Sequence, residues 1–129
     1  MRYAFGPTAA AAALMLSACA GGPSRAPIWI DGLRFLNYGS AAVTEVTLRV
    51  EATHELVACG YIPVRGECST MFPLREYHGN AVRLIWAQGD RRFESEPFVV
   101  PPPAAANPGQ SLTAIITLRD NGTYAARFD

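Results

Sequence analysis

Hydrophobic and polar residues alternate with a period of two along most of the chain after Ile28. In the segment VTLRVEA, Val46, Leu48, Val50 and Ala52 would point to one face and the residues between them to the other. The same alternation recurs at Val82, Leu84 and Trp86 and again at Leu112, Ala114, Ile116 and Leu118. This period is typical of β-strands with one buried face. No window of ten or more residues keeps helical spacing.

The pattern predicts seven or eight short strands. They are expected at 28–37, 43–53, 56–62, 68–74, 80–88, 91–100, 111–119 and 123–128. The DNG sequence at 120–122 predicts a tight hairpin between the last two strands, and the proline-rich segment 99–111 cannot lie inside a sheet. Short strands at regular intervals in a chain of 129 residues favour an all-β fold. The expected architecture is an antiparallel β-sandwich similar to the immunoglobulin and fibronectin type.

The first 18 residues differ in composition from the rest of the chain. They carry one positive charge, Arg2, followed by an uncharged apolar stretch over residues 9–16. That stretch is about half the length needed to span the hydrocarbon core of a bilayer. A basic start, a short apolar centre and small residues after it are typical of a secretory signal peptide. The alternative is a buried N-terminal helix, but Gly6 and Pro7 interrupt the run.

The end of this leader resembles a known motif. Leu16-Ser17-Ala18-Cys19 is similar to the lipobox of bacterial lipoproteins, which has an aliphatic residue, two small residues and a cysteine. The resemblance implies cleavage before Cys19 and attachment of lipid to its thiol. Two or three acyl chains, at about 0.8 kcal/mol per buried methylene, would give a durable membrane anchor.

The same resemblance gives the expected location and domain limits. In lipoproteins an aspartate after the cysteine favours retention at the inner membrane; here Ala20 follows, which implies the outer membrane, facing the periplasm. The expected organisation is a signal peptide at 1–18, a flexible Gly- and Pro-containing tether at 19–27 and one β-sandwich domain at 28–129.

Two further cysteines, Cys59 and Cys68, lie close together in the sequence. In an oxidising compartment such a pair usually forms a disulfide, and the glycines and proline between them would let the chain turn back. A metal site that adds His54 or His78 is the alternative. Eight residues between two cysteines match no common zinc spacing, so the disulfide is favoured.

The charge pattern argues against nucleic acid as a partner. All eleven basic residues are arginines, and they are scattered along the chain. After the predicted cleavage, the chain would have ten arginines and eleven acidic residues, a formal charge of −1. A protein that binds the phosphate backbone needs a concentrated positive surface, and none is visible here.

No catalytic motif is present in the sequence. It lacks a nucleophile elbow, a phosphate loop, a dinucleotide fingerprint and a zinc-protease signature. Ser69 or Ser95 could be paired with His54 or His78, but no spacing supports it. Glu94 and Glu96 could hold a cation on one strand face and are more simply explained as solvated residues. We therefore expect neither an enzyme nor a bound cofactor or metal.

One segment stands out by its side chains. Residues 71–80 are predicted as a loop that offers aromatic and arginine side chains, the residue types enriched at binding hot spots. The candidate partner-binding residues are Met71, Phe72, Arg75, Tyr77 and His78. In the alternative, structural reading, Phe72 and Tyr77 cap the end of the sandwich. A copper site at Met71 and His78 would lack further ligands.

These observations give one expected function with two alternatives. The expectation is a lipid-anchored cell-envelope protein whose non-catalytic β-sandwich binds or supports another envelope protein. An unpaired sheet edge would be one route to such binding, because it carries free backbone N–H and C=O groups. The alternatives are a periplasmic protein that binds a small ligand or a metal, and an enzyme with a site built from loops.

Overall fold

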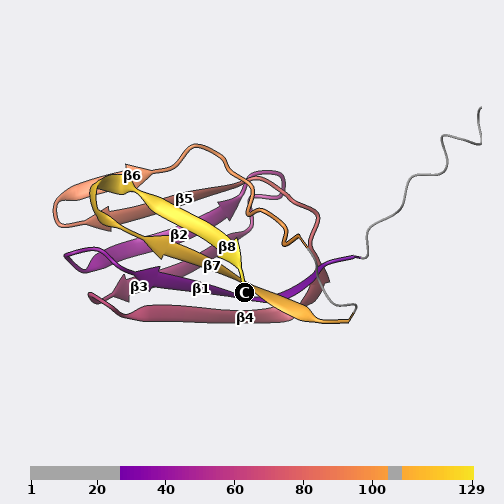
Figure 1. The fold of residues 1–129 in the computed structure, drawn as a ribbon. Coiled ribbons are helices and arrows are strands. Elements are labelled where there is room, and N and C mark those ends of the chain that lie inside the picture. Colours follow the sequence, from indigo (N-terminus) through magenta and orange to yellow (C-terminus); the bar gives the residue numbers. More distant parts are fainter. Residues whose placement is uncertain (1–26, 105–108) are drawn as a thin grey trace, which may run out of the picture.

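Two four-stranded β-sheets pack face to face and form the whole of the described fold (Figure 1). This computed structural model describes residues 27–104 and 109–129. The predicted signal peptide, Cys19 and all of the tether except Pro27 lie outside the described residues. Within them, no helix has the length and apolar character needed to cross a membrane. The predicted all-β sandwich is confirmed.

The strands follow the predicted order along the chain. They are β1 (Trp29–Asn37), β2 (Val43–Val50), β3 (Leu56–Ile62), β4 (Glu67–Glu76), β5 (Val82–Gln88), β6 (Arg91–Glu94), β7 (Ser111–Leu118) and β8 (Tyr124–Phe128). One sheet has the order β4-β1-β7-β8 and the other β3-β2-β5-β6. All neighbouring strands are antiparallel except β1 and β7, which are parallel. The sandwich was expected to be purely antiparallel, but the sheet that contains β1 and β7 is mixed.

The alternating residues form the core between the sheets. Leu48 on β2, Leu84 and Trp86 on β5 and Ile116 on β7 are all buried. Strand β7 is also buried on its outer face, where Ile115 is covered. Its register neighbours there are Arg34 of β1 and Arg127 of β8, and arginine stems of this kind can shield apolar surface.

Two expected strands end earlier than predicted, and the predicted hairpin is present. The strand expected at 91–100 ends at Glu94, and beyond it only a single bridge between Val82 and Phe98 continues the pairing. The strand expected at 43–53 ends at Val50, where the chain turns. The predicted tight hairpin between β7 and β8 is confirmed, because Asn121 and Gly122 both have positive φ, as two-residue hairpin turns require, and the Thr123 N–H donates to the Asp120 carbonyl at 3.2 Å.

The strand expected at 68–74 is confirmed and extends further than predicted, so the loop expected at 71–80 is wrong for its first six residues. Strand β4 continues to Glu76 at the edge of its sheet. Its Pro73 has no N–H to donate, and an edge strand with a bulge is where proline is tolerated. The bulge is visible in the register, because Met71 pairs with Gly32 whereas Arg75 pairs with Ile30. Pro73 therefore does not end the strand.

Candidate functional site

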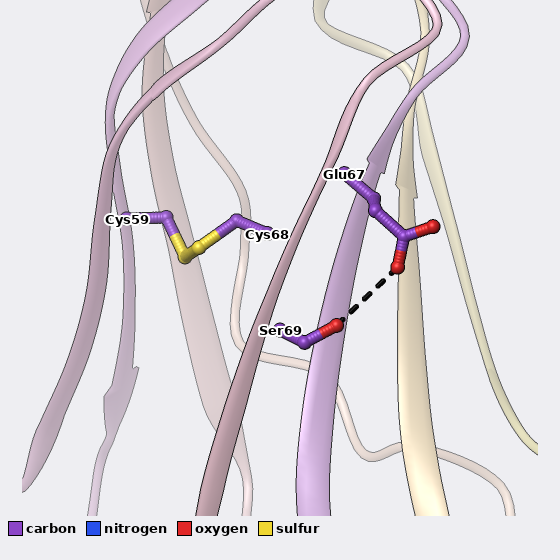
Figure 2. The surroundings of a disulfide bond; sticks show 4 residues. All are labelled: Cys59, Glu67, Cys68 and Ser69. Atoms are coloured by element: carbon purple, nitrogen blue, oxygen red, sulfur yellow. Dashed lines mark hydrogen bonds between the residues drawn. A yellow bond between two sulfur atoms is a disulfide. The ribbon is translucent and has the colours of Figure 1, made fainter.

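A disulfide ties the two sheets together at one side of the sandwich. Cys59 on β3 is bonded to Cys68 on β4, with 6.3 Å between their Cα atoms (Figure 2). Strands β3 and β4 are edge strands of different sheets. The predicted disulfide is confirmed, and it joins two edges instead of crossing the middle of the core.

The residues on either side of Cys68 face away from the bond. Figure 2 shows Glu67 and Ser69 directed opposite to the disulfide, with the Ser69 hydroxyl donating to Glu67 at 3.3 Å. Arg34 of β1 donates two hydrogen bonds of 3.1 Å to Glu67. These hydrogen bonds, with the charge of Arg34, hold the pKa of Glu67 below its ordinary value. This outer face of β4 is polar next to the disulfide.

On the inner side of β3 and β4, beyond the disulfide, the sheets leave a cleft of about 460 Å³. We call it the inter-sheet cleft. Its volume is within the range of small-molecule binding sites. Its apolar walls come from both sheets and from Val100: Ile30, Leu33, Leu48, Val50, Val57, Phe72, Tyr77, Val82, Val100, Ala114, Ile116 and Phe128. Several of these residues, such as Ile30, Val57 and Phe72, are only half-buried, so the cleft exposes apolar surface.

The lining of the cleft includes an ion pair that joins its two edges. Arg75 on β4 and Glu55, just before β3, lie 3.4 Å apart (Nη1 to Oε1). Their side chains are 50% and 52% exposed, and an ion pair this exposed contributes little to stability. The Arg75 guanidinium also lies 5.2 Å from the centre of the Phe72 ring. A covalent bond therefore closes one end of the gap between β3 and β4, whereas a weak, breakable contact spans the other.

Tyr77 fixes the chain where β4 ends. Its hydroxyl donates to the Val100 carbonyl at 2.6 Å, and its backbone N–H donates to the Ile28 carbonyl at 2.8 Å. Its ring packs edge-on against Phe128 at 4.9 Å. Burial raises the pKa of Tyr77, so the phenol stays protonated at neutral pH. The residue is rigidly held and places the start of β1 next to the cleft.

The structure brings four of the five predicted binding residues to one place. Phe72, Arg75, Tyr77 and His78 all line the inter-sheet cleft. Met71 does not, because it pairs with Gly32 on the outer face and is largely exposed. The two proposed copper ligands therefore lie on different surfaces.

The remaining wall residues were not predicted as binding residues. Val57, Val50 and Ile30 lie in expected strands, where an apolar residue reads in the sequence as an ordinary core position. Their half-exposure arises from the separation of two edge strands, which no local pattern encodes. No signal in the sequence could have identified them.

The described residues show no catalytic arrangement of the serines and histidines. The Ser95 hydroxyl is buried and accepts a hydrogen bond of 2.9 Å from the Leu84 N–H. Ser69 bonds to Glu67 instead. Glu94 forms an ion pair of 3.1 Å with Arg83. Over residues 27–104 and 109–129, no three His, Cys, Asp or Glu side chains are grouped to hold a metal.

Exposed large apolar side chains are concentrated on the two edge strands that border the cleft. Of the large hydrophobic residues exposed in the described part of the chain, most belong to β3, β4 and the turn between them. These are Leu56, Tyr61, Val64, Met71 and Leu74. We call these five residues the β3–β4 apolar rim. Exposed apolar residues concentrated on two edge strands make this part of the surface a candidate for interaction.

Comparison with known proteins adds little to this geometry. No protein-family model and no curated protein matches the chain. A solved structure with some likeness is the NMR structure of a protein from Eubacterium rectale. That alignment covers 84% of this chain and 93% of that chain, with 9% sequence identity and a TM-score of 0.45. The likeness is too low to assign a family.

Proposed function

We propose that the protein is a non-catalytic binding protein of the bacterial cell envelope, held at a membrane by lipid on Cys19. The lipobox-like sequence at 16–19 and the disulfide between Cys59 and Cys68 support this proposal. Structural disulfides persist in oxidising compartments outside the cytosol. Cleavage before Cys19 and residence at the outer membrane, facing the periplasm, belong to the same proposal.

The observation that carries the binding role is the β3–β4 side of the sandwich. It combines two unpaired sheet edges, the β3–β4 apolar rim and the inter-sheet cleft. Edge strands can accept a further strand through their free backbone groups. An envelope protein docked on this side is our first candidate. A small ligand held in the cleft is the second, which the apolar walls favour.

A matched pair of tyrosines tests the surface. Tyr61 on β3 and Tyr38 just after β1 are 64% and 63% exposed, but only Tyr61 belongs to the rim. In cross-linking from intact membranes, the variant Tyr61→Ser/Leu74→Ser should lose any partner captured by the wild type. Tyr38→Ser should retain it. Equal capture by both variants would refute the assignment of this side.

Mass spectrometry of the mature protein tests the tether separately. The expected product begins at Cys19 and carries the added mass of acyl chains. An intact Met1, or an unmodified Cys19 in cytosolic material, would contradict the envelope proposal.

A further inference from the structure

We infer that the inter-sheet cleft is a binding site for a single linear acyl chain that ends in an anionic head group, such as a fatty acid. The inference deepens the proposed function, on which it rests for the source of the ligand. It assigns the chain to the apolar walls and the head group to Arg75.

The walls of the cleft favour an acyl chain over a peptide. The interior is lined by aliphatic and aromatic side chains, with the charged and strongly polar residues Glu55, Arg75, Glu76, His78 and Asn80 coming from the chain just before β3 and just around the end of β4. A peptide inside it would bring backbone N–H and C=O groups that need partners, and leaving such groups unpaired is costly. A methylene chain has none, and each buried methylene contributes about 0.8 kcal/mol.

The ion pair gives the head group its position. Arg75 is the one arginine lining the cleft among the described residues, and Glu55 is its exposed partner. A ligand carboxylate can replace Glu55 beside the guanidinium, after which Glu55 returns to water. Because the pair is weak, this exchange costs little, and it opens the span between β3 and β4 through which a chain would enter.

The start of the described chain lies beside the cleft, so the proposed lipid anchor would hold the cleft near the membrane. The backbone hydrogen bond from Tyr77 to Ile28 holds the first described residues beside the cleft. The predicted tether of residues 19–27 extends from that point and could reach under about 30 Å. The cleft would therefore stay close to the membrane.

The test is a titration of the untethered chain, residues 20–129. This chain retains both sheets, because every strand lies within residues 29–128. Decanoate is the probe; acetate has the same head group without the chain, and decan-1-ol has the chain without the charge. Calorimetry should show binding of decanoate, weaker binding of decan-1-ol and none of acetate.

Single substitutions separate the two parts of the site. Arg75→Gln should weaken decanoate about tenfold, the scale of one charge-assisted hydrogen bond, and leave decan-1-ol unchanged. Glu55→Gln frees Arg75 and should tighten decanoate severalfold. Arg92→Gln, which removes an exposed arginine on β6 outside the cleft lining, is the control and should change neither.

Filling the cleft tests its walls. Thr70 lies on β4 and lines the cleft, and Thr70→Trp should abolish binding of both ligands while circular dichroism stays native. If that variant fails to fold, the opposite effects of Arg75→Gln and Glu55→Gln decide. No binding of decanoate by the wild type, or binding unchanged in all three variants, would overturn the inference. The titrated chain lacks Cys19, so a failure to bind decanoate would not count against the proposed membrane tether, which mass spectrometry tests separately.

Discussion

Asn37 is a fully buried polar residue at the end of β1, and it connects three parts of the chain. Its side-chain amide donates to the carbonyls of Ala41 and Ile62 at 3.0 and 3.1 Å, and its oxygen accepts the Gly39 N–H at 2.9 Å. A buried amide is tolerated only when its hydrogen bonds are made. Asn37 thus holds the β1–β2 connection against the end of β3.

Replacing Asn37 should lower the free energy of unfolding by more than the loss of a side chain of this size alone would. Asn37→Ala removes all three of these hydrogen bonds from a buried site, although the Ala41 carbonyl still accepts the Gln88 side-chain amide at 3.2 Å. We expect a loss of about 2–4 kcal/mol in the free energy of unfolding, measured by urea denaturation. Thr44→Ala, at an exposed position near the start of β2, is the control and should cost far less. Equal losses would mean that the buried hydrogen bonds are not the cause.

Asp120 performs a similar role with a charged group. Its carboxylate accepts the Ser40 N–H at 2.8 Å and the Gln88 side-chain amide at 3.0 Å. These hydrogen bonds, that of the Ser40 backbone foremost, hold the pKa of Asp120 below its ordinary value. The folded protein therefore binds this proton less readily than the unfolded chain does.

The consequence is a stability contribution that disappears in acid. It is fully present above the unfolded pKa of about 3.9 and is lost as the pH falls through the lower, folded pKa. At pH 6, Asp120→Asn should have a lower urea midpoint of unfolding than the wild type. The difference between the two midpoints should shrink at pH 3. Asp90→Asn, at a residue that makes no side-chain hydrogen bond within the described chain, should show no such convergence.

At the scale of the strands, β3 and β4 are joined by the turn at 63–66 but share no backbone ladder, so elsewhere side chains connect them. Their sheets are separate, and the disulfide and the Glu55–Arg75 pair span the gap between them. The short covalent loop from Cys59 to Cys68 restricts the unfolded chain, and the exposed pair adds little. The disulfide is thus the main link between the two edges.

Removing the disulfide should destabilise the domain measurably. Cys59→Ala/Cys68→Ala should lose about 2–3 kcal/mol of unfolding free energy, the value expected for a loop of this length. Reduction of the wild type should lower its urea midpoint similarly, whereas a reductant should not affect the double variant. Free thiols on both residues in protein from its native compartment would contradict a structural bond.

The strands were predictable because one buried face imposes a period of two. Leu84 and Trp86 on β5 illustrate this, since both are buried as the alternation requires. The end of β4 was predicted less well: the strand was expected to stop at residue 74 with a loop over 71–80, whereas an edge strand with a bulge tolerates Pro73 and continues to Glu76. The parallel pairing of β1 with β7 depends on segments far apart in the sequence, so no local pattern reveals it.

The candidate site was predictable only in part, for a related reason. Phe72, Arg75, Tyr77 and His78 were selected by residue type, and they do line the cleft. The cleft itself arises because two edges of different sheets diverge beyond the disulfide. That divergence is a property of sheet twist and packing, and the sequence of either strand does not contain it.

For the whole molecule, the position of the first described residues relates the fold to its proposed tether. The chain enters β1 beside Tyr77 and Arg75, where the inter-sheet cleft is lined by β4. A lipid on Cys19 would therefore hold the β3–β4 side near a membrane surface, and the short tether would limit how far the domain could move away. The tether would thus keep the proposed binding surface close to the membrane.

Two substitutions next to the predicted cleavage site test this arrangement in cells. Cys19→Ser removes the proposed lipid acceptor, so the protein should leave the membrane fraction or accumulate with its leader uncleaved. Ala20→Asp should instead keep the lipid and shift the protein from the outer to the inner membrane, as the lipoprotein resemblance implies. Cell fractionation with mass spectrometry of the N-terminus distinguishes these results. A Cys19→Ser protein that is still processed and still sediments with membranes after a carbonate wash would show that something other than lipid on this cysteine holds the domain there.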